Sequence, residues 1–423
     1  MKRLIRVCFL FLLFFLLPVL LGCRSTAPKT DGGADSAAFP LSDYLAAQLR
    51  ETAEVIDLRA YRPTEEEVAD TLAHLLAEEP DFFFVSPTYT LSFDPSGRQA
   101  ESMRSPVSLT PSYRFTGDAL REARADFASR VRAYAAPAKT YRSPLARVAY
   151  LHDRMVLDFS YDPGAHVSDP YTLLREGHGV CQAYSLLFLA LAREVEVPAA
   201  CVTCFSHTHA WNQVQIGLDW YHLDLTWDET LLPYPGRVPH TYFLLTDEEL
   251  AARRAAADET WAGVAWDAPH AANGTSLLSW ELADSYGAFA TVDGETLYYA
   301  VDDRVLALSP ASGTVREVYR VEDSPVDACL MTLVTLGGRI YCNLPNALLC
   351  ITPLVPSSAL SDADRHTGAL SDADVPFLSG GPPRETCTLS CPLSDDRLFY
   401  CGLSLSPAGL LLLSTLALFD APA

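Results

Sequence analysis

A glycine-bearing loop, a helix and three strands follow one another between Leu173 and Asp228, and this order constrains the fold more than any other stretch. The loop Gly177-His-Gly-Val-Cys181 precedes apolar residues at helical spacing, so Cys181 is expected at a helix N-terminus. Alternating segments at 199–205, 209–216 and 220–227 are expected to be strands. The segment is therefore predicted to be a helix followed by a small sheet that contains a hairpin.

A cysteine in this position has the setting of a nucleophile. The helix dipole and the unpaired N–H groups of the first turn stabilise a thiolate. The thiolate also needs a base, and the base needs a carboxylate that holds its tautomer. His209 opens the second predicted strand and Asp224 lies in the third. If Gly217-Leu218 forms a two-residue turn, Asp224 shares a sheet face with His209, whereas a three-residue turn through Asp219 places it on the other face.

Three motifs in this order resemble the transglutaminase-like domain of the papain-type thiol enzymes: Gly179–Tyr184, His209–Asn212 and Trp220–Asp228. The resemblance runs from about Leu145 to about Leu250, a quarter of the chain. It implies an α+β core in which a Cys-bearing helix packs on an antiparallel sheet that carries His and Asp. The family usually has Pro after the Asp, and this chain has Leu225 instead.

The resemblance also implies the catalytic roles. Cys181 corresponds to the nucleophile, His209 to the base and Asp224 to the orienting carboxylate. The backbone N–H of Cys181 is the expected oxyanion donor, and Gln182 and Tyr171 are further candidates for that role. No cofactor and no metal are expected.

Two alternatives compete with these roles. Asp228 is predicted on the same strand face as Asp224, so it is the alternative candidate for the orienting carboxylate. The spacing of Cys201, Cys204, His207 and His209 is also that of a zinc site. Residues 201 and 204 of one strand point to opposite faces, however, and Val202-Thr203 is a poor turn, so the thiol site is favoured over zinc.

The N-terminus predicts the compartment. A basic start precedes the apolar run Val7–Leu21, which is short for a transmembrane helix, and Gly22-Cys23 follows it. This arrangement resembles the lipobox of bacterial lipoproteins, which implies lipidation of Cys23. The small polar residues 24–38 suit a tether. We therefore expect a lipid-anchored protein on the extracytoplasmic face of a bacterial cell membrane.

The remaining regions flank the predicted catalytic domain. The N-terminal region alternates helices (42–51, 65–76 and 117–136) with strands (82–85, 89–93 and 107–113), and the C-terminal region repeats a turn followed by an aromatic strand. The repeat indicates a partial propeller-like β region, and Leu410–Phe419 is expected to be a buried strand pair or a frayed end. The predicted domains are a signal peptide (1–22), a tether (23–39), an N-terminal α+β module (40–138), the transglutaminase-like domain (139–272) and the β-repeat region (273–423).

The net charge of the chain limits the classes of partner. The chain has 31 basic and 53 acidic residues, a formal charge of −22, which disfavours nucleic-acid partners. The predicted function is a thiol enzyme that forms an acyl-Cys intermediate, most simply a cysteine peptidase or amidase acting on proteins, peptides or cell-wall peptides. The alternatives are a protein-glutamine transamidase and a non-catalytic surface-binding scaffold. The substrate does not follow from the sequence.

Overall fold

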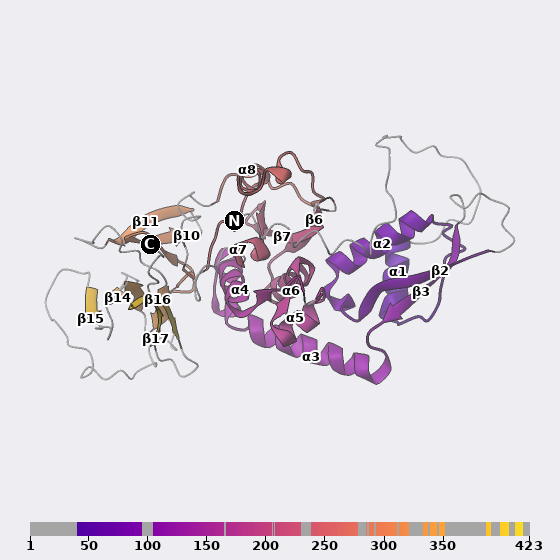
Figure 1. Cartoon of the computed structure of the whole chain (residues 1–423), viewed down its shortest axis with the longest axis horizontal. Helices are drawn as coiled ribbons and strands as arrows, with labels where there is room; N and C mark the ends of the chain where they lie inside the picture. Colours follow the sequence, from indigo (N-terminus) through magenta and orange to yellow (C-terminus); the bar gives the residue numbers. More distant parts are fainter. Residues whose placement is uncertain are drawn as a thin grey trace, which may run out of the picture. The chain divides into compact units, whose positions relative to one another are not determined.

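The computed structural model describes residues 40–94, 105–164, 166–204, 206, 208–229, 238–277, 285, 287–291, 293–310, 313–320, 333–336, 339–344, 347–351, 386–390, 398–405 and 411–417 (Figure 1). The predicted signal, Cys23 and the tether lie outside these residues, and so does His207. Within this part of the chain, no helix is both long and apolar enough to cross a membrane. The chain divides into two compact units, residues 1–130 with 162–189 and residues 131–161 with 190–423.

The first unit contains a three-stranded antiparallel sheet with the order β1-β3-β2. Two helices pack on each other beside it, and the second of them lies against β2 (Figure 1). Thr64 and Glu67 form a reciprocal capping box that starts the second helix, as the acidic start of this segment predicts. The elements are α1 (Leu41–Arg50), β1 (Ile56–Asp57), α2 (Glu65–Glu78), β2 (Val85–Phe93) and β3 (Pro106–Tyr113). The predicted α+β character of this region is confirmed.

The predicted strand at 82–85 is wrong. A 3-10 turn occupies Pro80–Phe82, and β2 begins only at Val85. Phe82, Phe83 and Phe84 are all buried, and the rings of Phe82 and Phe83 both lie edge-on to the ring of Phe84. Ser86-Pro87 does not separate two strands; it lies where the register of β2 against β3 shifts.

Further helices follow along the chain. Those at 117–136 and after Cys181 are predicted from the sequence, whereas the 7-residue α5 is too short to show a period. Ser143 caps α4, because its hydroxyl accepts a hydrogen bond from the N–H of Ala146 at 3.0 Å. The helices and two short strands are α3 (Gly117–Ala135), α4 (Pro144–Asp158), β4 (Ser160–Tyr161), α5 (Pro170–Glu176), β5 (His178–Gly179) and α6 (Cys181–Glu194).

The second unit contains the antiparallel sheet β6-β7-β8, formed by Ala199–Cys204, His209–Ile216 and Asp219–Leu223. Ile216 pairs with Asp219 across the turn Gly217-Leu218. Gly217 has φ +67°, in the left-handed region that glycine adopts without steric cost. This is the register predicted from a two-residue turn.

The third predicted strand ends at Leu223, and the prediction of a strand to 227 is wrong. Residues Leu225–Glu229 form the helix α7. Asp224 starts this helix: its Oδ1 accepts a hydrogen bond from the N–H of Trp227 at 3.2 Å, and its carbonyl accepts one from the N–H of Asp228 at 3.1 Å. Leu225 therefore occupies the first helical position, which proline also favours, so Leu in place of the usual Pro suits the same backbone.

One further helix, α8 (Asp247–Ala257), closes the core next to this sheet. It begins with a second capping box, formed by Thr246 and Glu249. Leu250 of α8 packs in one buried cluster with side chains from β6, from β7 and from the segments on either side of α8. The other members are Val202, Cys204, Trp211, Tyr242, Leu245 and Trp261. The sheet and α8 thus share one core.

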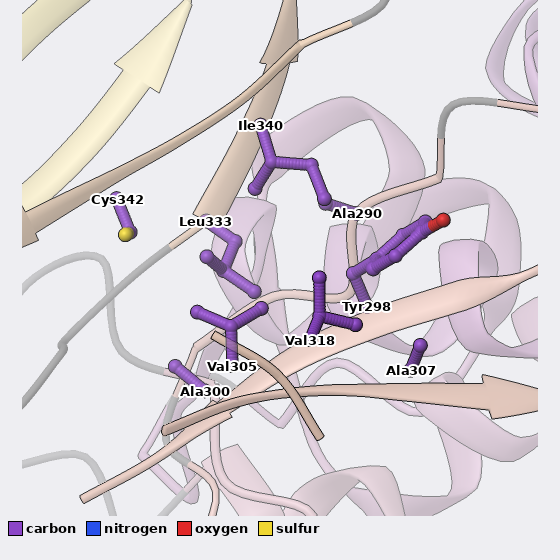
Figure 2. Packing of buried hydrophobic residues seen from close by; sticks show 9 residues of the cluster. All are labelled: Ala290, Tyr298, Ala300, Val305, Ala307, Val318, Leu333, Ile340 and Cys342. Carbon is purple, nitrogen blue, oxygen red and sulfur yellow. The ribbon is translucent and has the colours of Figure 1, made fainter. Parts of the chain in front are cut away.

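The C-terminal strands form three antiparallel sheets, β11-β10-β9, β12-β13-β14-β15 and β16-β17. Side chains from the first two meet in the buried cluster of Figure 2, which includes Tyr298, Val305, Leu333 and Ile340. The strands are β9 (Leu297–Val301), β10 (Arg304–Ser309), β11 (Thr314–Arg320), β12 (Leu333–Leu336), β13 (Arg339–Leu344), β14 (Ala347–Ile351), β15 (Thr386–Ser390), β16 (Leu398–Leu405) and β17 (Leu411–Ala417). The β character predicted for this region is confirmed, with part of the apolar run at 410–419 forming β17.

Candidate active site

Local sequence explains why a helix starts at Cys181. Gly177, at φ +81°, ends α5 with a left-handed residue. Gly179 has no room for a side chain, because a Cβ there would lie 3.1 Å from the carbonyl oxygen of Val167. Val180 precedes the first turn of α6, and its carbonyl accepts the N–H of Tyr184 at 3.2 Å. Cys181 is therefore the first helical residue, and its buried thiol, which forms no disulfide with a described residue, lies in the first unit.

The two side chains proposed as further oxyanion donors have other partners. The Tyr171 hydroxyl donates to a carboxylate oxygen of Asp126 at 3.1 Å. The amide of Gln182 reaches the carbonyl oxygen of Leu76 at 3.5 Å. The backbone N–H of Cys181 thus stays the principal prediction for the oxyanion donor.

His209 and Asp224, both in the second unit, are brought together by the hairpin. His209 Nε2 lies 2.7 Å from Asp224 Oδ2. The imidazole is 9% exposed and the carboxylate 1% exposed, so solvent weakens this hydrogen bond little. The predicted pairing of an imidazole with an orienting carboxylate is present in the structure.

Asp224 has donors on both of its oxygens. Oδ1 accepts from the Thr226 hydroxyl at 3.0 Å and from the N–H of Trp227, and Oδ2 accepts from His209 and from Arg254 Nη2 at 2.5 Å. Burial alone would raise the pKa of Asp224, but His209, Arg254 and the Thr226 hydroxyl together lower it to about 2. The carboxylate is thus held ionised and in one orientation.

Aromatic rings surround the imidazole. The ring of Trp211 stacks on His209 at 5.6 Å between centroids, and Trp261 meets it edge-on at 6.1 Å. Trp227 lies at 6.2 Å. The guanidinium of Arg254 is buried among the same rings. Sequence analysis missed Arg254, because Arg253-Arg254 near the end of a polar helix has the pattern of two solvent-exposed charges.

A second buried polar cluster lies near the start of α7. His152 of α4 contacts two carboxylates: Nδ1 lies 3.0 Å from Asp153 Oδ1, and Nε2 lies 3.1 Å from Asp228 Oδ2. His240 Nε2 lies 2.9 Å from the same oxygen of Asp153. The N–H of Tyr242 donates to Asp228 Oδ1 at 3.0 Å. The prediction that Asp228 shares a strand face with Asp224 is wrong, because Asp228 lies in α7 and takes part in this cluster.

Metal binding can be judged from the same distances. Among the described residues, His152, Asp153 and His240 offer three ligand atoms within 4.8 Å of one another. The nitrogens that face Asp153 and Asp228 lie at ordinary hydrogen-bond distances from the carboxylate oxygens. Cys201 and Cys204 lie in one uninterrupted strand, as expected from the poor turn between them, and both thiols are buried.

The His152 cluster predicts a pH dependence of stability. Burial alone would lower the pKa of His152, but its hydrogen bonds with Asp153 and Asp228 raise it to about 9. A folded-state pKa above the unfolded value of about 6.5 means that stabilisation is complete below pH 6.5 and is lost as the pH rises through 9. We expect the free energy of unfolding to fall by on the order of 3 kcal/mol over this range.

Denaturant unfolding at a series of pH values measures this effect. In His152→Gln the loss between pH 6.5 and 9 should disappear. His178→Gln, a change in the more exposed histidine of β5, serves as the control and should keep the wild-type dependence. An unchanged pH dependence in His152→Gln would show that the imidazole is not the titrating group.

Comparison with known proteins places the site in a family. The sequence profile of the Transglutaminase-like superfamily matches residues 132–225, a range that includes Cys181, His209 and Asp224. None of the curated proteins matches the chain.

Three chains among the solved structures match as well, including the following two. One is a protein from Cytophaga hutchinsonii assigned as a cysteine protease (16% identity, 34% of this chain and 63% of that one, TM-score 0.21), and the other is a TGase (15% identity, 33% and 44%, TM-score 0.22). The chain thus spans less than two thirds of either, and the profile match is what identifies the domain. Through residues 132–225, this chain carries a domain of the transglutaminase-like superfamily.

Proposed function

We propose that the protein is a thiol enzyme in which the Cys181 thiolate attacks the carbonyl carbon of a peptide or amide bond. The His209 imidazolium then gives its proton to the departing amine, which leaves an acyl thioester on Cys181. In the second step His209 takes a proton from water, and the resulting nucleophile attacks the thioester. The carboxylic acid departs, and the thiolate and imidazolium are restored.

The observation that carries this proposal is the hydrogen bond between His209 Nε2 and Asp224 Oδ2, at 2.7 Å. A carboxylate at Nε2 keeps the proton on that nitrogen, which leaves Nδ1 as the basic nitrogen for the proposed proton transfers. The position of Cys181 at the start of a 14-residue helix adds the dipole that favours a thiolate. A peptidase or amidase acting on proteins, peptides or cell-wall peptides fits this chemistry.

Transfer to an amine is the alternative outcome of the same thioester. A protein-glutamine transamidase differs only in the second nucleophile, and it must exclude water from the intermediate. The rings of Trp211, Trp227 and Trp261 around His209 suit the wall of a hydrolase groove as well as that of an amine tunnel. We favour hydrolysis, since water competes in either case.

We also infer that the protein is held at the extracytoplasmic face of a bacterial membrane by a lipid on Cys23. The basic start, the apolar run and the Gly22-Cys23 junction support this inference. Cys23→Ala should leave the protein unprocessed or release it into the soluble fraction. Processing at another site in the wild-type chain, without lipid, would contradict it.

An activated thiol should be visible by selective alkylation. At pH 6 an ordinary cysteine is well under about 1% thiolate, so Cys181 should react with iodoacetamide well before Cys201, Cys204 and Cys342. His209→Ala should slow this reaction. Equal labelling of Cys181 and the other cysteines by mass spectrometry, or labelling insensitive to His209, would favour the non-catalytic scaffold instead.

The second nucleophile is identified from the products. A glutamine-containing peptide offered with excess labelled primary amine should yield the free acid in an amount that the amine does not change. Cys181→Ala is the control and should yield neither product. Stoichiometric incorporation of the amine with little acid would replace the hydrolase by the transamidase.

A further inference from the structure

Arg254 is a charged side chain with no exposure to solvent. It lies in the last turn of α8, its relative exposure is 0%, and its Nη2 donates to Asp224 Oδ2 at 2.5 Å. A buried guanidinium is costly unless it is paired, so its presence requires a specific partner. Asp224 is that partner, and the oxygen that Arg254 uses is the one that also accepts His209.

Three tryptophans hold the guanidinium in place. Arg254 Cζ lies 3.8 Å from the ring centroid of Trp211, 4.4 Å from that of Trp261 and 5.2 Å from that of Trp227. Among the described residues, Arg254 Nε and Nη1 have no hydrogen-bond acceptor. Electrostatic attraction to the aromatic faces takes the place of those bonds, which leaves Asp224 as the directional partner.

We propose that Arg254 is a positioning residue, which keeps Asp224 a carboxylate and fixes Oδ2 on the line to His209. The proposal rests on the proposed function, because a role for His209 in proton transfer gives the orientation its value. Arginine suits the task better than lysine, since its flat guanidinium stacks on indole rings while one nitrogen donates in a fixed direction.

The other titratable groups near this pair come from all sides of the core. Tyr242 and Cys204 interact electrostatically with Arg254, and His222 with both Arg254 and Asp224. Arg254 and His209 are the cations that lower the pKa of Asp224. Loss of Arg254 would therefore leave one cation, His209, to keep the carboxylate ionised.

Stability supplies a test that does not depend on activity. Arg254→Gln and Asp224→Asn each leave one buried charge without its partner, so each should lower the melting temperature of the full chain. The double variant removes both charges and should melt higher than Arg254→Gln alone and higher than Asp224→Asn alone. Additive losses would show that the two side chains are not coupled and would overturn the proposal.

Kinetics then tests positioning as opposed to mere packing. Arg254→Gln should lower kcat by about 10- to 100-fold, as expected for a group that orients a reacting residue, and should move the acid limb of the pH–rate profile to higher pH. Arg254→Lys retains the charge, so its acid limb should stay near the wild-type position although kcat falls. An acid limb unmoved in folded Arg254→Gln would overturn the positioning role.

The neighbouring arginine provides a matched control. Arg253 lies in the same turn of α8 but donates to the carbonyl oxygen of Thr241. Arg253→Gln should leave both the acid limb and the coupling with Asp224 unchanged. If no variant, including the wild type, turns over a substrate, the proposed function fails. The carboxyl 13C shift of Asp224 as a function of pH then serves in place of the acid limb, and an unchanged pKa of Asp224 in Arg254→Gln would overturn the proposal.

Discussion

The buried carboxylate of Asp224 is the point on which this half of the molecule depends. Four donors converge on its two oxygens, from β7, α7 and α8, and a carboxylate in that setting is both ionised and immobile. The same residue directly follows β8 and caps α7. Asp224 lies where the chain changes from strand to helix, and its position at the start of α7 orients its carboxylate toward His209.

A second network of hydrogen bonds holds the backbone around the Asp224 carboxylate. The N–H of Asp224 donates to the carbonyl oxygen of Tyr242 at 2.9 Å, and the N–H of Tyr242 donates to the carboxylate of Asp228. Asp228 in turn contacts His152 on α4. Two buried polar networks, one at the imidazole and one at α4, therefore share the single turn of chain from Asp224 to Asp228. Because unpaired polar groups in such a core are costly, the networks restrict this turn to one arrangement.

The position of Cys181 and the pairing of His209 with Asp224 follow from two different local features of the sequence. The start of α6 at Cys181 follows from its neighbours in sequence: Gly177 with a left-handed backbone, Gly179 without space for a side chain, and apolar residues at helical spacing. The pairing of His209 with Asp224 follows from the length of one turn, because a two-residue turn at Gly217-Leu218 sets the register of the whole hairpin. The sequence predicted the helix start directly, but it predicted the pairing only for a two-residue turn, and the structure shows that this turn is present.

The features that the sequence did not predict depend on tertiary packing. The segment 224–229 alternates like a strand but folds as a helix, because Asp224 finds donors within that helix and Asp228 finds a histidine from α4. Phe82 to Phe84 likewise form a turn, since a common core buries all three rings. By itself the sequence determined the helix at Cys181 and limited the hairpin to two registers, because helical period and turn residues are local features. The candidate residues followed from the resemblance of three motifs to a known family. Only the tertiary structure decided that Arg254 is buried on Asp224, because the side chains that surround a charge come from distant parts of the chain.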